Sequence, residues 1–269
     1  MRTKISLIKV QGNAGLVPLH HQQIVSAFLE EMIQEAGHST DRYVFSSLKG
    51  TSKVQNGQIR YLSNKVTLVI GSGDQEFLEQ VLLKIAAKKY HNIGKLNVMP
   101  KAQESIPDPE FKTVMKYVCI SPLIPAPAIT EEGAEPVALD PMSHEFSDML
   151  YNIVIDQMEK ADFSEADLNT FAEFEVTPDA EYIKKLNEAG KKYARIYKNN
   201  KNKAMIGYLL PFTLHAHPTV HKFIWDGGFG LYGTHGYGMI DIVQPERKKK
   251  KPFNPNRGGN RLSRPRREN

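Results

Sequence analysis

The sequence has one cysteine, Cys119, and no apolar run of the length that a membrane span requires. A single cysteine excludes an intramolecular disulfide and any zinc site built on several cysteines. A bilayer-spanning helix needs about 20 consecutive apolar residues, so a transmembrane protein is excluded as well. The first eleven residues alternate between apolar and polar types and lack the apolar core of a signal peptide, so we expect a cytoplasmic protein without a membrane partner.

A uniform excess of positive charge is also lacking, although the formal net charge is +5. Residues 246–269 hold ten Lys or Arg and two Glu, which leaves residues 1–245 with 25 basic and 28 acidic side chains. A polyanion must therefore bind the main body at a local basic patch, helped by this tail. The tail is poor in apolar residues and is predicted to be disordered, and it either follows phosphates or only adds solubility.

Strands and helices alternate in a repeated order along the rest of the chain, whose hydrophobic content of 41% supports a core. Residues 1–115 predict β-α-β-β-α-β, with amphipathic helices over residues 20–37 and 74–90 and a hairpin turn at Asn56-Gly57. Residues 116–245 predict roughly the same order, with extra material between Asp162 and Lys192. This order is the ferredoxin-like unit, a four-stranded sheet covered by two helices on one face. We therefore predict an α+β protein of two tandem ferredoxin-like domains, 1–115 and 116–245.

Six glycines lie between Trp225 and Met239, just before the apolar residues MIDIV. They are Gly227, Gly228, Gly230, Gly233, Gly236 and Gly238. A dinucleotide fingerprint requires a strand before its glycines and a helix after them, and here that order is reversed. A P-loop fails because Thr234-His235 stands where Lys-Ser/Thr is required, so no cofactor is predicted. Two interpretations remain: backbone whose N–H groups approach a polyanion, or a tight crossover from helix to strand. We favour the first, because a crossover needs only one or two glycines.

The stretch from Gly227 to Val243 resembles the C-terminal glycine-rich loop of the CRISPR-associated repeat-processing endoribonucleases, a family of the RAMP superfamily. The insert of this loop, Leu231 to His235, lacks the Lys or Arg that the family often has there. VPLHHQQIVSAFLEEMI and YVFSSLKG are similar to the family's first helix and to the strand that follows it, and YVCISPLI to the start of its second half. The resemblance implies metal-independent cleavage of a CRISPR repeat transcript. CRISPR repeat RNA is the predicted partner, and other CRISPR effector subunits and a homodimer are further candidates.

Cleavage of RNA can use the 2′-hydroxyl of the substrate as nucleophile, so the protein must align that oxygen, move protons and neutralise the phosphate. The products would be a 2′,3′-cyclic phosphate and a 5′-hydroxyl. His38, just beyond the first helix, is the predicted general acid or base. Arg42, Tyr43 and Lys49 complete the predicted catalytic group, with both cations on the scissile phosphate.

The resemblance also places the family's histidine at Gln34 and its helix tyrosine at Glu30. An alternative follows from these departures: a subunit that binds guide RNA on the same fold without cutting it. A third hypothesis is a general RNA-binding module unrelated to CRISPR.

The predicted RNA-binding residues are the six glycines together with His21, Lys53 and His235. His21 opens the first helix, whose N-terminus could receive a phosphate, although a simple helix-entry role is preferred. Lys53 belongs to a set of cations that alternate with Tyr43, Phe45 and Tyr61. This pattern suits stacked bases and paired phosphates, or equally a solvated sheet face. The histidines of HAHPTVH have metal-like spacing, but a helix start at His217-Pro218 is the simpler interpretation, and no metal is predicted.

Overall fold

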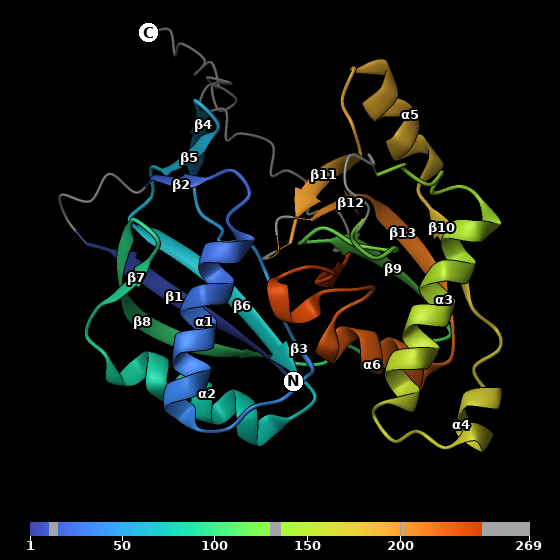
Figure 1. Cartoon of the computed structure of the whole chain (residues 1–269), viewed down its shortest axis with the longest axis horizontal. Coiled ribbons are helices and arrows are strands. Elements are labelled where there is room, and N and C mark those ends of the chain that lie inside the picture. The colour runs from blue at the N-terminus through green and yellow to red at the C-terminus, as the bar shows by residue number, and fades with distance from the viewer. Residues whose placement is uncertain (11–15, 130–135, 200, 202, 244–269) are drawn as a thin grey trace, which may run out of the picture.

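The computed structural model describes residues 1–10, 16–129, 136–199, 201 and 203–243. Two α/β units lie side by side, and residues 107–113 connect the last strand of one to the first strand of the other (Figure 1). The tail predicted to be disordered, residues 246–269, lies outside the described residues. Among the described helices, none is both long enough and apolar enough to cross a bilayer.

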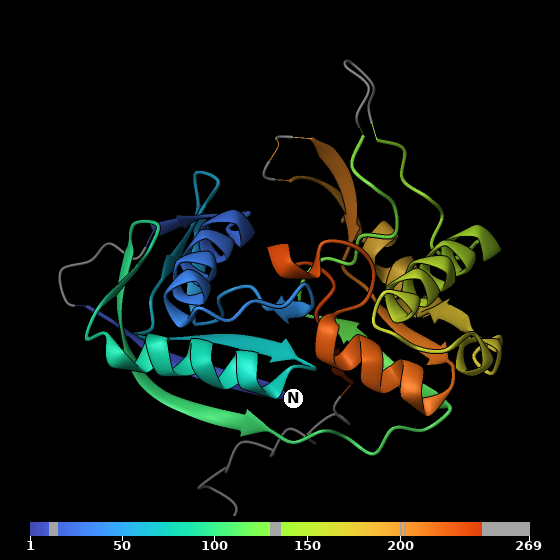
Figure 2. The same ribbon diagram turned by 60° about the horizontal axis from the view of Figure 1, so that its bottom comes forward.

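The first unit is built on an antiparallel sheet with the strand order β3-β6-β1-β8-β7. These strands are β1 (Arg2–Lys9), β3 (Tyr43–Phe45), β6 (Lys65–Ser72), β7 (His91–Ile93) and β8 (Leu96–Ile106). Helices α1 (Gln22–Ala36) and α2 (Gln75–Ala87) cover one face of the sheet (Figure 2). A separate small sheet contains β2 (Leu16–Pro18), β5 (Gln58–Tyr61) and β4 (Ser52–Gln55). With β7 and the small sheet as additions, the order of the main strands is that of a ferredoxin-like unit.

Local sequence signals set the ends of these helices as predicted. Gly37 ends α1 in the left-handed conformation, with φ of 69°. The Asp74 side chain accepts a hydrogen bond of 2.9 Å from the N–H of Phe77 and begins α2. Asn56 and Gly57 have φ of 50° and 69° and form the turn between β4 and β5, which confirms the predicted hairpin.

The second unit repeats the arrangement in the strand order β10-β13-β9-β14. Its sheet contains β9 (Val114–Cys119), β10 (Glu175–Pro178), β13 (Pro211–His215) and β14 (Ile240–Ile242). Its main helices are α3 (His144–Glu159) and α6 (Pro218–Gly227), and α4 (Glu165–Asn169) and α5 (Ala180–Glu188) are shorter additions. The prediction of an α+β protein with two ferredoxin-like units is confirmed.

One strand of the second unit was predicted wrongly. The sequence predicts two strands joined by a Lys/Asn turn over residues 194–216. The structure has three strands there: β11 (Ala194–Lys198) and β12 (Ala204–Tyr208) form a sheet of their own, and only β13 joins the main sheet. The missing sheet strand is β10, which lies inside the stretch treated as extra material. Its four residues end in a proline and are too few to show an alternating pattern.

The two units meet where α6 and the short 3₁₀ helix η1 (Gly233–His235) contact β3, β6 and α1. In both ribbon views the loop that carries η1 lies between α1 and the second unit (Figures 1 and 2). Each unit has its own apolar core, the first around α1 and α2 and the second around α3 and α6.

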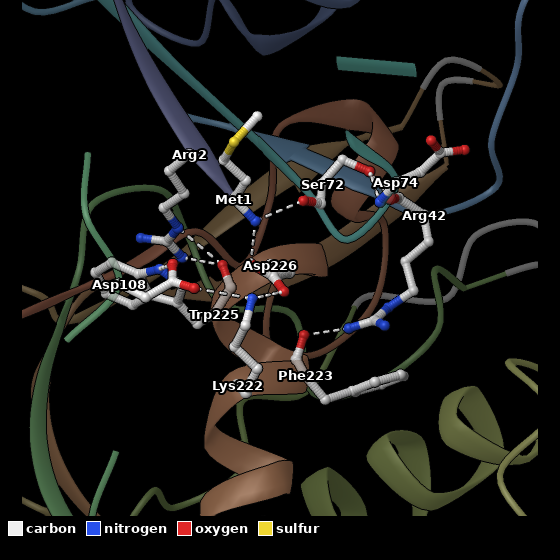
Figure 3. A network of polar contacts seen from close by, with 10 residues as sticks. All are labelled: Met1, Arg2, Arg42, Ser72, Asp74, Asp108, Lys222, Phe223, Trp225 and Asp226. Carbon is white, nitrogen blue, oxygen red and sulfur yellow. Dashed lines mark hydrogen bonds and ion pairs between the residues drawn. The ribbon is translucent and has the colours of Figure 1, made fainter. Parts of the chain in front are cut away.

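Polar contacts hold the end of α6 against the first unit (Figure 3). Arg2 of β1 is 1% exposed. Its Nε donates to the Trp225 carbonyl over 2.8 Å, and its Nη1 donates to the Ile240 carbonyl. The guanidinium carbon of Arg2 lies 3.6 Å from the centroid of the Trp225 ring. Asp226 is almost fully buried and pairs with Lys222 and with the amino group of Met1.

Candidate functional site

A cavity of about 770 Å³ opens between the two units. The first unit contributes residues 40–43 to its wall, and α3 contributes Gln157 and Lys160. The rest of the wall comes from the glycine-rich segment, at Gly227, Gly230, Tyr232, Gly233, Thr234 and His235.

A second cavity of about 200 Å³ lies beside the first, between α1 and the β11–β12 hairpin. Ser26 and Glu30 of α1 line it opposite Lys198 and Tyr237, and His235 lines both cavities. We call the two together the cleft. Its walls hold one histidine, two carboxylates and three cations, contributed by both units: His235, Asp41, Glu30, Arg42, Lys160 and Lys198.

His235 faces α1 across the cleft. Its Nδ1 lies 3.3 Å from Thr234 Oγ1, and the carbonyl of Thr234 lies 3.5 Å from Ser26 Oγ. Ser26 Oγ also donates to Glu30 Oε1 over 2.9 Å. Burial lowers the pKa of His235 below its usual value, and the charge of Glu30 partly opposes this shift. The neutral imidazole is therefore favoured near pH 7.

The glycines of this segment are explained by contacts inside the protein. A Cβ at Gly227 would lie 2.4 Å from Arg42 Nε, and one at Gly236 would lie 2.4 Å from the Phe45 ring. At Gly230 it would meet the Ile124 carbonyl at 2.6 Å. The number of glycines, which favoured a polyanion contact in the sequence, therefore has a structural cause of its own.

Several N–H groups of the segment are already bonded. Gly238 donates to the Pro122 carbonyl over 2.7 Å, Gly236 to the Gly233 carbonyl, and Gly228 to the Ile224 carbonyl. The N–H groups of these three residues are used within the fold, and their predicted contacts with RNA stay predictions. The predicted RNA contacts of Gly227, Gly230, Gly233 and His235 stay predictions, and all four residues line the larger cavity.

His38 does not line either cavity of the cleft. Its Nε2 lies 3.0 Å from Asp74 Oδ2, and its ring lies beside that of Phe77 at the start of α2. The N–H of Phe77 and then His38 lower the pKa of Asp74, which favours the carboxylate of this pair. The catalytic role of His38 stays a prediction, and the structure gives this histidine a local ion-pair partner instead.

Arg42 and Tyr43 line the larger cavity, yet both side chains are used in packing. Arg42 Nη2 donates to the Phe223 carbonyl, and its guanidinium lies over the Phe223 ring at 3.0 Å from the centroid (Figure 3). Burial lowers the pKa of Arg42 to about 10 and raises that of Tyr43 to about 12. Tyr43 is only 6% exposed and packs against Phe45 and Phe77. Both residues shape the cleft, and their predicted catalytic roles stay predictions.

The aromatic residues of the early strands do not form a base-stacking face. Tyr43, Phe45 and Tyr61 are 6%, 0% and 2% exposed, so that part of the sequence interpretation is wrong. Lys49 and Lys53 are exposed, on the edge of the main sheet and on β4 respectively. Neither lysine lines the cleft. Their predicted contacts with RNA stay predictions.

The buried histidines serve the fold. His21 is 3% exposed, and its Nε2 accepts a hydrogen bond of 2.9 Å from the N–H of Leu48. This burial leaves the His21 side chain no surface for RNA and favours the helix-entry role. His221 is fully buried between the Tyr117 hydroxyl and the Thr113 carbonyl. His217 begins α6 by accepting from the N–H of Thr219 over 3.2 Å, as its position before Pro218 predicts. No group of three or more His, Cys, Asp or Glu that could hold a metal ion is found among the described residues.

The cleft contains residues that the sequence analysis did not select. Ser26 and Glu30 are four residues apart on α1, a spacing that places them on the same face of the helix. That spacing could indicate a site on α1, but only when the segment across the cleft, which carries His235, is known. Gln157 and Lys160 carry no local signal, because polar residues on helices are ordinary surface positions.

Positive charge is concentrated beside the cleft. Residues 184–203 hold eight Lys or Arg and one acidic residue, Glu188, within a body that is otherwise acidic. We call this segment the basic stretch; it begins in the second half of α5, includes β11 and ends just before β12. Lys191, Lys192 and Arg195 are exposed and line a further cavity of about 570 Å³. Lys198 of the same stretch lines the cleft itself.

A family model described as "CRISPR associated protein Cas6, C-terminal" matches residues 106–242. Three solved structures are similar over 91% of the chain, each with a TM-score of 0.72. A CRISPR associated protein Cas6 is 19% identical with 99% of its own chain covered, and a Cas6-related protein from Pyrococcus furiosus is 19% identical with 98% covered. A RAMP protein described as binding different RNA substrates is 16% identical with 100% covered. At these identities the structures show the same fold. The comparison with curated proteins gave no match.

Proposed function

Because this chain belongs to the CRISPR associated protein Cas6 family, we propose that it binds CRISPR repeat RNA in its cleft and cuts the precursor transcript within the repeat. The observation that carries the proposal is the composition of the cleft. His235, Lys160 and Lys198 of the second unit and the carboxylates of Glu30 and Asp41 of the first unit line one cavity system beside the glycine-rich segment.

The chemistry fits a reaction in which RNA supplies its own nucleophile. Attack of a 2′-oxygen on the adjacent phosphorus requires alignment, a group that accepts a proton, and positive charge near the phosphate. Lys160 lines the larger cavity and Lys198 the smaller one, so each cavity has a lysine that can supply that charge. The expected products are a 2′,3′-cyclic phosphate and a 5′-hydroxyl.

Incubation with the repeat RNA of the host in excess EDTA tests this proposal. We expect a single cut within the repeat, with a cyclic-phosphate end identified by mass spectrometry and by its sensitivity to acid. Repeat RNA with a 2′-deoxyribose at the cut nucleotide is the matched control substrate, and it should bind without being cut. Cleavage that disappears with EDTA and returns with a divalent cation would contradict the metal-independent reaction.

The alternative is a subunit that holds guide RNA and does not cut it. Glu30 and Gln34, at the positions where the resemblance places the family's tyrosine and histidine, favour this alternative. Tight binding of the repeat without any cut product would support it. Equal binding to unrelated hairpins would instead indicate a general RNA-binding module. Two further partners are part of the proposal: other CRISPR effector subunits and a second copy of the chain. Light scattering with and without RNA measures the mass of the assembly and so detects either of them when both components are present.

The basic stretch makes a quantitative prediction about salt. A variant with Lys191, Lys192 and Arg195 all changed to Gln should bind repeat RNA more weakly. It neutralises fewer phosphates and therefore releases fewer counterions on binding. Each phosphate contact with single-stranded RNA contributes about −0.7 to the slope of log K against log salt, so loss of three contacts should flatten the slope by about 2. Filter binding at salt concentrations from about 50 to about 300 mM measures this slope.

A control variant removes the same charge elsewhere. Lys89, Lys101 and Lys112 are also exposed and lie outside the basic stretch and the cleft. Changing all three to Gln should leave the slope near the wild-type value. Equal flattening in both variants would mean that the RNA responds to net charge and not to this surface.

A further inference from the structure

His235 occupies the junction of the two cavities that form the cleft. It lines the cavity of about 770 Å³ and the cavity of about 200 Å³, which have no other lining residue in common. An RNA strand that continues from one cavity into the other therefore passes the imidazole. A proton-transfer group must lie within reach of the reacting atoms, and this position meets that condition.

The backbone around His235 is fixed by the fold. The N–H of His235 donates to the Tyr232 carbonyl over 3.0 Å, and the N–H of Gly236 donates to the Gly233 carbonyl over 2.9 Å. Tyr232 and Gly236, on either side of η1, have φ of 64° and 83°. The Tyr232 hydroxyl in turn accepts from the N–H of Ala128 over 2.9 Å. A catalytic group is effective when it is held in place before the substrate binds, and these contacts fix the backbone that carries the imidazole.

Helix α1 places a carboxylate opposite this imidazole. Glu30 lines the smaller cavity with His235, and Ser26 donates to Glu30 Oε1 over 2.9 Å. Ser26 also lies 3.5 Å from the carbonyl of Thr234, the residue before His235. Ser26 Oγ thus lies between the Glu30 carboxylate and the main-chain carbonyl next to His235, at the boundary between the two units.

We infer that His235 is the general base of the proposed cleavage and that Glu30 positions it. This inference rests on the proposed function and names the catalytic group for it. The proton of the 2′-hydroxyl passes to the imidazole as the bond from O2′ to phosphorus forms and the bond from phosphorus to O5′ breaks. O5′ leaves with a proton from water, and the imidazolium returns its proton to solvent. The products are the 2′,3′-cyclic phosphate and the 5′-hydroxyl.

The protonation state suits this role. Burial lowers the pKa of His235, and Glu30 opposes the shift without reversing it. Other charged groups that line the cleft are Asp41, Arg42, Lys160 and Lys198. The base form is therefore the major one at neutral pH, and the cleavage rate should rise with pH to a plateau.

Single-turnover cleavage of repeat RNA by His235→Ala and His235→Gln tests the inference. Loss of a general base lowers a rate by about 10²–10⁴-fold, and we expect a loss in this range for both variants. Binding of the 2′-deoxy repeat should stay at the wild-type level, and added imidazole should restore part of the activity of His235→Ala. His144→Ala removes an exposed histidine at the start of α3 and is the matched control, with wild-type cleavage expected.

The pH profile separates a catalytic role from a structural one. In the wild type the rate should fall in acid with an inflection below 6.5, the ordinary histidine pKa, as the base form is protonated. In Glu30→Gln the inflection should move to lower pH, because the charge that raises the pKa of His235 is removed. Thermal melting of each variant checks that the fold is kept.

Each other outcome overturns the inference. Wild-type cleavage by His235→Ala would exclude His235, and loss of cleavage in His38→Ala alone would assign the role to His38. A loss accompanied by equal loss of 2′-deoxy RNA binding, without imidazole rescue, would make His235 a binding residue. Absence of cleavage by the wild type itself, with binding retained, would reject the proposed enzyme together with its base, a result distinct from the failure of His235 alone.

Discussion

Replacing Gly238 by alanine will destabilise the protein by more than about 4 kcal/mol, the range reached only when a core or backbone feature is broken. Gly238 has φ of 74°, and a Cβ there would lie 2.2 Å from the Phe229 carbonyl oxygen. Neither backbone can move aside easily. The Gly238 carbonyl accepts from the N–H of Phe229 over 2.8 Å, and the N–H of Gly238 donates to the Pro122 carbonyl over 2.7 Å. Urea unfolding followed by circular dichroism measures the loss of stability. Failure of the variant to accumulate as folded protein would also agree with the predicted destabilisation.

Gly190→Ala is the control for this prediction. Gly190 belongs to the same unit and has φ of 62°, but no heavy atom lies within 4 Å of a Cβ placed there. Alanine at this position should cost only the unfavourable left-handed backbone conformation, about 1–2 kcal/mol of stability. Similar losses in the two variants would show that backbone conformation alone, and not the collision with Phe229, decides the effect.

Replacing Arg2 by methionine should destabilise the protein by about 3–5 kcal/mol, since hydrogen bonds from a charged donor contribute about 1.5–3 kcal/mol each. Methionine keeps much of the side-chain volume, but it leaves the carbonyls of Trp225 and Ile240 without their donor. Burial lowers the pKa of Arg2 to about 10, because removing the charge from water is unfavourable. The hydrogen bonds to these carbonyls offset that desolvation. We expect a lower midpoint in urea and earlier proteolysis between the two units.

Lys4→Met is the matched control on the same strand. Lys4 lies two residues from Arg2, and its ion pair with Glu104 joins side chains that are 37% and 51% exposed. Exposed pairs of this kind contribute about 0–1 kcal/mol, so the midpoint should barely change. If Arg2→Met were as mild as Lys4→Met, the carbonyls at the end of α6 would not depend on Arg2.

The fold could be predicted from the sequence because its main elements carry strong local signals. The stripe Phe77, Leu78, Val81, Leu82 and Ile85 of α2 is buried as its spacing predicts. Asp74 and Gly37 mark helix ends, and Asn56-Gly57 marks a hairpin. Strand β10 lacked such a signal, because Glu175–Pro178 is held by its partner β13 and not by its own composition.

The candidate site could be predicted only in part, because it is made by contacts between distant residues. The glycine-rich segment was selected from the sequence and lines the larger cavity, but the reason for its glycines depends on Arg42, Phe45 and Ile124, which no local pattern connects to it. His38 was selected by its place after α1, whereas its side chain is directed by Asp74. Glu30 and His235 are 205 positions apart in the chain and meet only after the two units have docked.

The contact between Arg2 and the end of α6 also has a consequence for the order of events during synthesis. The first sheet is complete once Ile106 has been made, so that unit can fold while the ribosome is still translating the second. The acceptors of Arg2 lie 223 and 238 residues further along the chain. From Ile106 to these acceptors the chain grows by 119 to 134 residues, so at roughly 5–20 residues per second the folded first unit waits about 6–27 s for them. During that interval the nascent first unit presents an unpaired cation on a face that is later sealed. The cleft is therefore among the last features of the protein to exist, and a nascent chain cannot hold RNA in it until nearly all of residues 1–243 have been made.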